Sequence, residues 1–300
     1  MQRAALASRY ARPVGDGGAR IEAVEDAADP RLDDYRDLRD AALRVRQGVF
    51  IAESREVVRQ LLAGTRFRAR SVLATAPALA ALRPALDAAD PAPRVLVAHH
   101  DVIRKVAGFD FHRGCLAVGE RGAEPAPDAL VDPPGARLVL VLENVSNPDN
   151  VGAIFRNAMA FAVDAVLLST RSVDPLYRKA IRVSMGGALR VPFARLSDWA
   201  GGLARLAAAG YAVVALTPSP AALELAHLGV ERPLPDRVAL LVGAEGHGLG
   251  AEARDAAHLD VRIPMAPGVD SLNVATAVGI ALHHLRHRGL GQHDASAPPR

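Results

Sequence analysis

The chain has 300 residues, of which 50% are apolar and 23% are charged, and this balance excludes a wholly disordered, collagen-like or coiled-coil protein. Its 36 basic and 33 acidic residues leave a net charge of +3, which says little about a partner. The length favours about two domains. No apolar run reaches the ~20 residues that a membrane span needs, and the N-terminus lacks the apolar core of a secretory signal. We therefore expect a cytoplasmic protein that does not act within a membrane.

The sequence contains one cysteine, Cys115, which cannot form an intramolecular disulfide. Because its neighbours are apolar, we expect a buried thiol that packs as a small apolar side chain. Cysteine and histidine occur nowhere with the spacing of a zinc site, so no metal is expected.

Residues 1–30 are rich in Gly, Ala and Asp and are expected to form a loose leader. From residue 31 to 120, helix-like and strand-like patterns alternate, which predicts a small α/β domain. Its helices are expected at 33–46, 55–63, 77–89 and 100–107, and its strands at 49–52, 71–74, 95–98 and 115–118. Four prolines and a lack of periodicity between residues 121 and 136 predict a linker.

Residues 137–288 contain longer apolar strands and predict a second α/β domain, followed by a frayed tail at 289–300. Strands are expected at 138–142, 165–168, 211–216, 238–242 and 261–263, and helices at 151–162, 176–185, 199–209 and 272–287. The unbroken apolar run at 138–142 is typical of a parallel strand that is buried on both faces. A parallel sheet with helices on both faces binds ligands beyond the carboxyl ends of its strands, so the loops there are candidate sites.

The first candidate loop spans residues 143–150 and leads into a helix that carries Arg156. Asn150 occupies the position of an N-cap, and capping alone would explain it. Arg156 follows Ile154 and Phe155 directly, and a guanidinium within an apolar helix needs a partner or a substrate. The loop therefore offers two candidate site residues, Asn150 and Arg156.

The second candidate loop spans residues 243–250 and contains four glycines, which allow a ligand to approach the backbone closely. It is not a P-loop, because the only lysines of the chain, Lys105 and Lys179, lie far away in the sequence. It is not a dinucleotide-binding loop either, because the βαβ unit that such a loop opens does not follow. Glu245 is either an acid at a helix start or a carboxylate of a site, and both interpretations stay open.

The third candidate stretch combines Ile263-Pro264-Met265 with Ser271-Leu272-Asn273-Val274. Ser271 or Asn273 is placed to cap the final helix, and the small residues that follow permit close backbone packing. By itself this stretch indicates no particular chemistry.

In this order, the three stretches resemble the motifs of the SpoU or TrmH-type branch of the SPOUT RNA methyltransferases. Residues 147–156 match Asn-Pro-x-Asn-x-Gly-x-x-x-Arg, and residues 243–249 match Gly-x-Glu-Gly-x-Gly-Leu. Residues 263–274 hold Ile-Pro-Met followed by Ser-Leu-Asn-Val. The resemblance covers residues 137–288, and the sequence departs from the motifs at none of these positions.

The resemblance implies a homodimeric enzyme that transfers a methyl group from S-adenosyl-L-methionine to a ribose 2′-hydroxyl of RNA, without a metal. It also implies a catalytic domain whose C-terminal segment is threaded into a trefoil knot, a feature that hydrophobic patterns do not reveal. The implied cofactor-binding residues are Thr217, Gly243, Ile263, Met265 and Leu272. The implied residues of the methylation site are Asn150, Arg156, Glu245, Ser271 and Asn273.

The implied reaction needs an aligned 2′-hydroxyl and a group that accepts its proton. The family proposal often casts the arginine as the base, but an arginine side chain stays protonated in a protein. Arg156 is better suited to grip the adjacent phosphate and to hold the 2′-hydroxyl in line. Glu245 or a phosphate oxygen then accepts the proton.

The first domain resembles, through residues 50–54 and 112–114, the ribosomal-protein-like RNA-binding domain that precedes many such catalytic domains. Nine arginines face four acids between residues 36 and 70, and a second basic stretch spans residues 178–195. Such strips suit phosphate contacts, although a solvated helix face gives the same pattern. The predicted RNA-binding residues are Arg55, Arg66, Arg68, Arg70, Arg113, Arg178 and Arg182.

The additional RNA-binding domain favours ribosomal RNA over transfer RNA as the substrate, by family analogy alone. Two alternatives stay open: a tRNA methyltransferase, and a non-catalytic RNA-binding protein that has kept the fold. A nucleotide-dependent oxidoreductase is disfavoured because no dinucleotide fingerprint occurs early in the chain.

Overall fold

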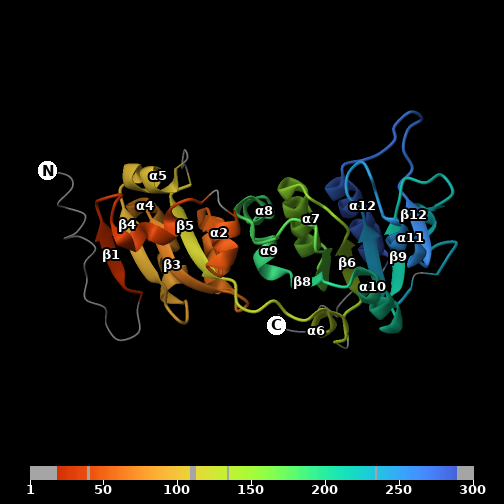
Figure 1. The fold of residues 1–300 in the computed structure, drawn as a ribbon, viewed down its shortest axis with the longest axis horizontal. Helices are drawn as coiled ribbons and strands as arrows, with labels where there is room; N and C mark the ends of the chain where they lie inside the picture. Colours follow the sequence, from red (N-terminus) through yellow and green to blue (C-terminus); the bar gives the residue numbers. More distant parts are fainter. Residues whose placement is uncertain (1–18, 39–40, 109–112, 134, 234, 289–300) are drawn as a thin grey trace. The chain divides into compact units, whose positions relative to one another are not determined.

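The structure, a computed structural model, describes residues 19–38, 41–108, 113–133, 135–233 and 235–288 (Figure 1). These residues fold into two compact units. The first unit runs to Ala123 and also includes Leu176–Arg190, and the second comprises Glu124–Pro175 and the chain from Val191 onward. The expected tail and the first part of the expected leader lie outside the described residues. None of the described helices is both long enough and apolar enough to span a membrane.

The sheet of the first unit mixes parallel and antiparallel pairs. Its strand order is β1 (Ile21–Val24), β4 (Arg94–Ala98), β3 (Arg68–Ala74), β5 (Cys115–Glu120) and β2 (Val49–Glu53). Strands β1, β4 and β3 are parallel, and β5 runs antiparallel to both β3 and β2. The presence of β1 corrects the expectation that residues 1–30 form only a loose leader. This edge strand is held by an ion pair between Glu22 and Arg94 of β4, which composition alone does not reveal.

The helices described in the first unit are η1 (Pro30–Tyr35), α2 (Ala41–Arg46), α3 (Arg55–Ala63), α4 (Ala76–Asp87), α5 (His100–Ala107), α8 (Arg178–Val183) and α9 (Gly187–Arg190). The single helix predicted over residues 33–46 is wrong, because this segment is divided between the 3-10 helix η1 and α2. Tyr35 accounts for the break: its side chain is fully buried, and its hydroxyl lies 2.8 Å from Ser71 Oγ on β3. This anchor holds the end of η1 against the sheet.

Glu22 and Asp29 form an ion-pair network with Arg31 and Arg94 at the β1 edge. Glu22 Oε2 lies 2.9 Å from Arg31 Nη1 and 2.8 Å from Arg94 Nη2. The hydrogen bond from Arg94 is the main reason why the pKa of Glu22 is lowered from 4.5 to about 2. A carboxylate with a depressed pKa stabilises the fold at higher pH and loses that contribution on acidification. We expect the stability of the first unit to fall as the pH drops from 4.5 to about 2.

Urea denaturation at about pH 6 and about pH 3 measures this loss. Glu22→Gln should lower the free energy of unfolding at the higher pH and should weaken its dependence on acid. The control Asp87→Asn removes an exposed partner of Arg83 and should leave that dependence unchanged. Acid sensitivity that is the same in Glu22→Gln and in the unaltered chain would contradict the prediction.

The second unit is built on a sheet in which every described pair of neighbouring strands is parallel. Its strand order is β10 (Leu223–Glu224), β12 (Leu259–Arg262), β9 (Ala212–Leu216), β11 (Val238–Val242), β6 (Leu138–Leu142), β7 (Ala165–Ser169) and β8 (Phe193–Leu196). The parallel sheet predicted from the apolar runs is confirmed, and β6 and β11 are buried along their whole length. Strands β8 and β10 are not predicted, because both are short and contain a charged residue, Arg195 and Glu224.

The helices described in the second unit are α6 (Pro127–Val131), α7 (Pro148–Ala160), α10 (Trp199–Ala208), η2 (Leu225–His227), α11 (Ala251–Asp255) and α12 (Val274–His287). Helix α6 lies within the predicted linker and is bound to the sheet through Arg237. The Arg237 guanidinium donates to three carbonyl oxygens, those of Val131, Ala136 and Ala209. This part of the linker therefore packs as an integral piece of the second unit.

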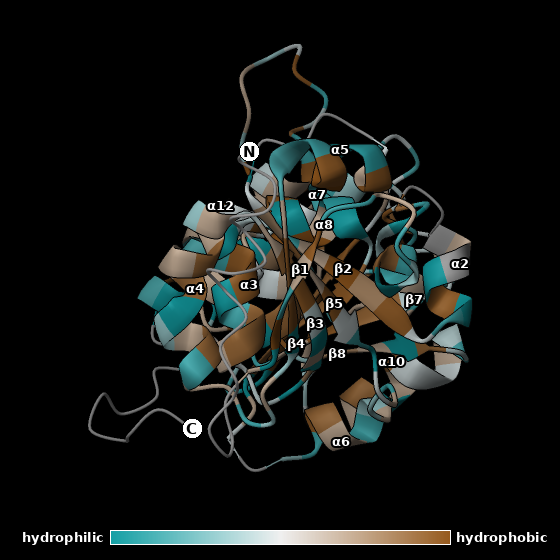
Figure 2. Cartoon of the chain, turned by 90° about the vertical axis from the view of Figure 1, so that its left-hand side faces the viewer, coloured by the Kyte–Doolittle hydropathy of each residue, from teal (hydrophilic) through white to brown (hydrophobic). Residues whose placement is uncertain are grey.

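Apolar residues gather on the strands, which are mainly brown in Figure 2, whereas the helices alternate brown with teal. The cores are accordingly formed by Val, Leu and Ala, with Tyr35 and Tyr211 among the largest buried side chains. Cys115 at the start of β5 is buried, as predicted. Burial raises the pKa of its thiol to about 12, because the thiolate would lose its hydration.

The strand order of the second unit brings four chain segments to one edge of the sheet. Strands β12, β9, β11 and β6 are consecutive neighbours and are parallel, so their carboxyl ends share that edge. The segments that leave these ends begin at Ile263, Thr217, Gly243 and Glu143. The three candidate stretches, far apart in the sequence, therefore meet where a parallel sheet binds its ligands.

Candidate active site

Three side chains from three segments form a hydrogen-bonded cluster at this edge. Asn150 Nδ2 donates to Glu245 Oε1 at 2.6 Å. Asn273 Nδ2 donates to Asn150 Oδ1 at 2.9 Å and to the same Glu245 oxygen at 3.1 Å. The cluster thus joins α7, the loop after β11 and the start of α12, and it fixes one oxygen of the Glu245 carboxylate.

Asn273 serves two purposes in the structure. Its Oδ1 accepts hydrogen bonds from the backbone of Ala275 (3.0 Å) and Thr276 (3.2 Å), so it is the N-cap of α12. Its amide nitrogen remains available for Asn150 and Glu245. The sequence left two interpretations open for Asn273, a cap and a site residue. The cap is confirmed, and the free amide group lets the same side chain join the cluster.

Asn150 is not the N-cap that the sequence suggested. Asn147 caps α7 and accepts from the Asp149 backbone at 2.9 Å, with Pro148 as the first helical residue. Asn150 lies within the first turn, and its side chain is buried against Glu245 and Asn273. Pro148 was the signal in the sequence, because proline favours the first position of a helix. The N-cap therefore falls at the residue before Pro148, which is Asn147.

The loop of residues 243–250 folds back on itself, which presents Glu245. Gly248 N donates to Ala244 O at 3.0 Å, and a Cβ on Gly243 would lie 2.3 Å from the Gly248 carbonyl carbon. Gly246 and Gly248 have φ angles of +84° and +65°, which side chains other than glycine rarely adopt. The glycines therefore shape this turn, and Glu245 is exposed at its tip.

Arg156 and Ser271 are placed differently from the cluster. Arg156 lies on the exposed face of α7, so the argument that an apolar helix surrounds it is wrong, because the helical phase turns it away from Ile154 and Phe155. The side chains of Arg156 and Ser271 are both exposed to solvent, and neither belongs to the hydrogen-bonded cluster. Arg156 lies on the same helix as Asn150, and Ser271 lies two residues before Asn273.

The residues implied for cofactor binding follow three adjacent strands. Thr217 follows β9 directly, and its N–H donates to Val261 O of β12 at 2.9 Å. Gly243 follows β11 directly. Ile263 and Met265 follow β12 and are partly buried, whereas Leu272 is 38% exposed. The edge thus combines backbone groups of a glycine-rich turn with accessible apolar side chains, which suits a flat heterocycle. Within the described ranges, no group of three His, Cys, Asp or Glu side chains is arranged to hold a metal ion.

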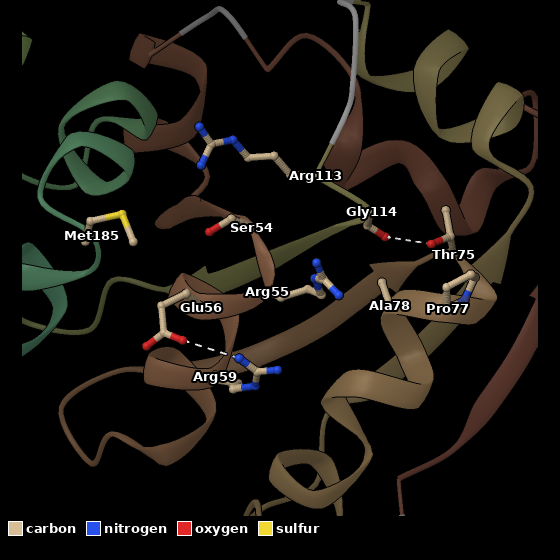
Figure 3. A pocket seen from close by; sticks show the side chains of 10 residues that line it. All are labelled: Ser54, Arg55, Glu56, Arg59, Thr75, Pro77, Ala78, Arg113, Gly114 and Met185. Atoms are coloured by element: carbon tan, nitrogen blue, oxygen red, sulfur yellow. Dashed lines mark hydrogen bonds and ion pairs between the residues drawn. The ribbon is translucent and has the colours of Figure 1, made fainter.

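A second candidate site lies in the first unit, in a cavity of about 730 Å³ beside the starts of α3 and α4 (Figure 3). Three arginines line it, namely Arg55, Arg59 and Arg113. Ser54, at the start of α3, has a φ of +96°, and its Oγ accepts from Val57 N at 3.4 Å. Backbone strain of this kind clusters at functional sites. Arg59 pairs with Glu56 at 3.3 Å, so part of the positive charge is neutralised within the cavity.

The other arginines predicted to contact RNA differ in their surroundings. Arg178 Nη1 lies 2.8 Å from the buried carboxylate of Glu53, and Arg182 and Arg113 lie 3.9 Å and 4.0 Å from it. The remaining three arginines lie at or just before the start of β3. Arg66 lies over the Phe67 ring, and Arg68 is exposed. Arg70 forms ion pairs with Asp34 and Glu120. Arg178 is thus mainly committed to Glu53, whereas Arg68 is free to meet solvent. His112, which is part of the predicted match at residues 112–114, lies outside the described residues.

Comparisons with known proteins show similarity to RNA methyltransferases. The model of the SpoU rRNA Methylase family matches residues 137–283. An uncharacterized tRNA/rRNA methyltransferase of Mycobacterium bovis is 43% identical over 276 residues, which cover 91% of this chain and 94% of that protein. A 23S rRNA (guanosine-2′-O-)-methyltransferase of Acinetobacter baylyi is 31% identical over 202 residues, which cover 65% of this chain and 78% of that protein.

A solved structure extends the similarity across both units. The AdoMet-bound rRNA methyltransferase from Sinorhizobium meliloti matches with a TM-score of 0.74 and 26% identity, covering 90% of this chain and 99% of that one. This chain belongs to the SpoU rRNA Methylase family, as the three motifs predicted.

Proposed function

We propose that this protein transfers a methyl group from S-adenosyl-L-methionine to a ribose 2′-hydroxyl of RNA, with ribosomal RNA as the substrate. The observation that carries the proposal is the cluster of Asn150, Glu245 and Asn273 at the carboxyl edge of the parallel sheet. The name of the Acinetobacter relative, a 23S rRNA (guanosine-2′-O-)-methyltransferase, supports the ribose hydroxyl and the ribosomal substrate.

The residues at the edge fit the proposed cofactor. Gly243, Ile263 and Leu272 would offer backbone groups to an adenine edge, with Thr217 and Met265 nearby. Accessible Leu272 and Val269 give an apolar surface for the faces of a purine. When bound, S-adenosyl-L-methionine supplies an electrophilic methyl group on a sulfonium centre.

The side chains of the cluster have separable tasks in this proposal. Asn150 and Asn273 hold Oε1 of Glu245, so Oε2 is free to accept the proton of the 2′-hydroxyl. Arg156 is exposed and binds the neighbouring phosphate with both arms of its guanidinium, which holds the hydroxyl in line. Ser271, in the segment before α12, contacts the same ribose.

Mapping of 2′-O-methylated nucleotides tests the proposal directly. Ribosomal and transfer RNA from cells with and without this gene are compared, and one ribosomal site should lose its methyl group when the gene is absent. A loss in transfer RNA instead would favour the alternative substrate. Calorimetry with S-adenosyl-L-methionine distinguishes an enzyme from a non-catalytic RNA-binding homologue, because a homologue of that kind would bind RNA without the cofactor.

Replacement of Arg156 by Lys tests its role as a phosphate clamp. A lysine keeps the charge but cannot form two parallel hydrogen bonds, so methyl transfer should fall by about 10²-fold through lost alignment. The measurement is transfer of a labelled methyl group to RNA at saturating cofactor. The control Arg205→Lys alters an exposed arginine of α10 and should leave the rate unchanged. Full activity of Arg156→Lys would exclude both the clamp and a special role as a base.

The arginine-lined cavity of the first unit is proposed to bind RNA phosphates. A double change of Arg55 and Arg113 to Ala should weaken RNA binding and lower the slope of log K against log salt concentration by about 2, one for each phosphate contact. Filter binding or fluorescence anisotropy over a salt series measures this slope. The triple variant of Arg66, Arg68 and Arg70 to Ala should reduce the slope further. A slope that neither variant changes would place the RNA contacts elsewhere.

We also propose that the protein is a homodimer formed through the groove between α7 and α12. This groove has a volume of about 480 Å³, and it includes Phe161 and the 41% exposed Ile280 as well as Asn273 of the cluster. A second copy seated there would bring its surface beside the active site. Light scattering should give twice the 31.5 kDa of one chain, and Ile280→Asp should halve that mass.

The threading of the chain into a trefoil knot is a further part of the proposal. Strand β12 lies beside β9, on the side away from β11, yet the chain that follows returns so that Asn273 meets Asn150 of α7. Such a return is what a threaded segment produces. Single-molecule stretching from both ends should stop short of the ~3.6 Å per residue of an unknotted chain.

A further inference from the structure

Glu143 is a buried carboxylate that the proposed reaction does not use. It is the first residue after β6, and only 7% of it is exposed. A carboxylate is rarely buried without a partner, since removing its charge from water costs free energy that hydrogen bonds must offset. Its partners therefore indicate what it does.

Glu143 bonds to both ends of the glycine-rich loop. Its backbone N–H donates to Val242 O at 2.9 Å, directly before the loop. Its side-chain Oε2 accepts from Gly250 N at 2.7 Å, at the loop's last residue. A Cβ on Gly250 would lie 2.9 Å from Oε1, so the carboxylate packs closely against that backbone. One residue thus closes the loop that presents Glu245.

The loop needs such a closure because of its composition. Four of its eight residues are glycines, which lose more conformational freedom on ordering than any other residue. The short bond between a carboxylate and a backbone N–H is of the stronger kind. The other bonds of the loop are the one from Gly248 to Ala244, those of Glu245, and two from Arg254 to the carbonyl oxygens of Leu249 and Gly250. None of them holds the Gly250 N–H, which the Glu143 carboxylate binds.

Glu143 is itself held from the opposite side. The next residue, Asn144, has a φ of +54°, and its N–H donates to Ser169 Oγ at 2.8 Å. Ser169 in turn contacts Ser172 Oγ at 3.2 Å, and Ser172 donates to Leu142 O at 3.1 Å. The ends of β7, β6 and β11 are therefore joined in one hydrogen-bonded series that terminates at Gly250.

We infer that Glu143 is a positioning residue, which acts by holding the loop 243–250 in the shape that binds the cofactor and presents Glu245. The inference rests on the proposed function, since it assigns the loop to the methyl donor. Its effect reaches the reaction through the loop and not through contact with the reacting atoms.

Two substitutions test whether the hydrogen bond from Gly250 N–H to the Glu143 side chain is what holds the loop. Glu143→Ala removes the acceptor for Gly250 N–H and should weaken the binding of S-adenosyl-L-methionine about tenfold, as measured by calorimetry. Glu143→Gln keeps an oxygen that accepts the same bond and should restore affinity to within about twofold. The control Ser71→Ala removes the buried partner of the Tyr35 hydroxyl in the first unit. It should lower the melting temperature while leaving the cofactor affinity unchanged.

Hydrogen exchange of the cofactor-free chain gives a readout that does not depend on activity. Amides of residues 244–250 should exchange faster in Glu143→Ala than in Glu143→Gln or in the unaltered chain, whereas those of β6 and β11 should not change. Equal exchange in all variants would overturn the inference, and so would Glu143→Gln behaving as Glu143→Ala. If the unaltered chain does not bind the cofactor, the proposed function fails, but the exchange rates still decide the role of Glu143.

Discussion

Glu245→Gln is expected to lower the rate of methyl transfer by about 10²- to 10⁴-fold, the range over which general bases contribute. The amide oxygen of a glutamine can still accept hydrogen bonds from Asn150 and Asn273, so the geometry of the cluster should persist. The change removes only the ability to accept the proton of the 2′-hydroxyl. Single-turnover assays at saturating cofactor and RNA measure this chemical step.

The matched control is Glu252→Gln, which alters an exposed carboxylate in the first turn of α11. It should leave both the rate and the affinity for the cofactor unchanged. A full rate in Glu245→Gln would exclude this carboxylate as the base and would assign the proton to a phosphate oxygen of the RNA. Asn150→Ala and Asn273→Ala should each lower the rate, and their effects should not add, because they orient one oxygen together.

Arg237→Ala is expected to have the largest effect on stability, a loss of about 4 kcal/mol in the free energy of unfolding of the second unit. The substitution removes the guanidinium donor from the carbonyl oxygens of Val131, Ala136 and Ala209. The first two would then keep only the longer bonds from the Tyr211 hydroxyl. It also removes the guanidinium that lies 4.1 Å from the Tyr211 ring centroid. Arg237→Lys, with one compact charge in place of the fork, should recover only part of the loss.

Trp199 makes this measurement specific, because it is the single tryptophan of the chain and lies in α10 of the second unit. Its fluorescence in urea therefore reports on that unit alone. The control Arg205→Ala breaks exposed ion pairs with Asp128 and Asp132 near α6, which should cost less than about 1 kcal/mol. Losses of similar size in Arg205→Ala and Arg237→Ala would show that Arg237 acts only as a surface charge.

The central strands of the second sheet were predictable because an apolar run buried on both faces leaves a clear signal. The edge strands were not predictable, because β1 contains Glu22 and β10 ends in Glu224. A charged residue in a short edge strand gives the segment the sequence pattern of a loop. The break between η1 and α2 was equally hidden, because it depends on the hydroxyl of Tyr35 reaching Ser71, 36 residues further along the chain.

The meeting of Asn150, Glu245 and Asn273 was predictable from motif order, which a family resemblance supplied. The accessibility of Arg156 was not, because it depends on which face of α7 the packing buries. Glu143 was named only as the start of a loop, and its partner Gly250 lies 107 residues away. Gly250 ends the loop after β11, a strand that becomes a neighbour of β6 only in the folded sheet. Contacts of this kind follow from topology and not from local pattern.

The burial of Cys115 has a practical consequence for labelling the protein with a fluorophore. A thiol with its pKa raised to about 12 carries almost no thiolate at neutral pH, so maleimide reagents should leave it unmodified in the folded chain. The protein therefore behaves as cysteine-free for labelling without any prior substitution. A single cysteine introduced at exposed Val269 would carry a fluorophore in the segment between β12 and α12. Its signal would report in real time how that segment becomes ordered when the cofactor binds.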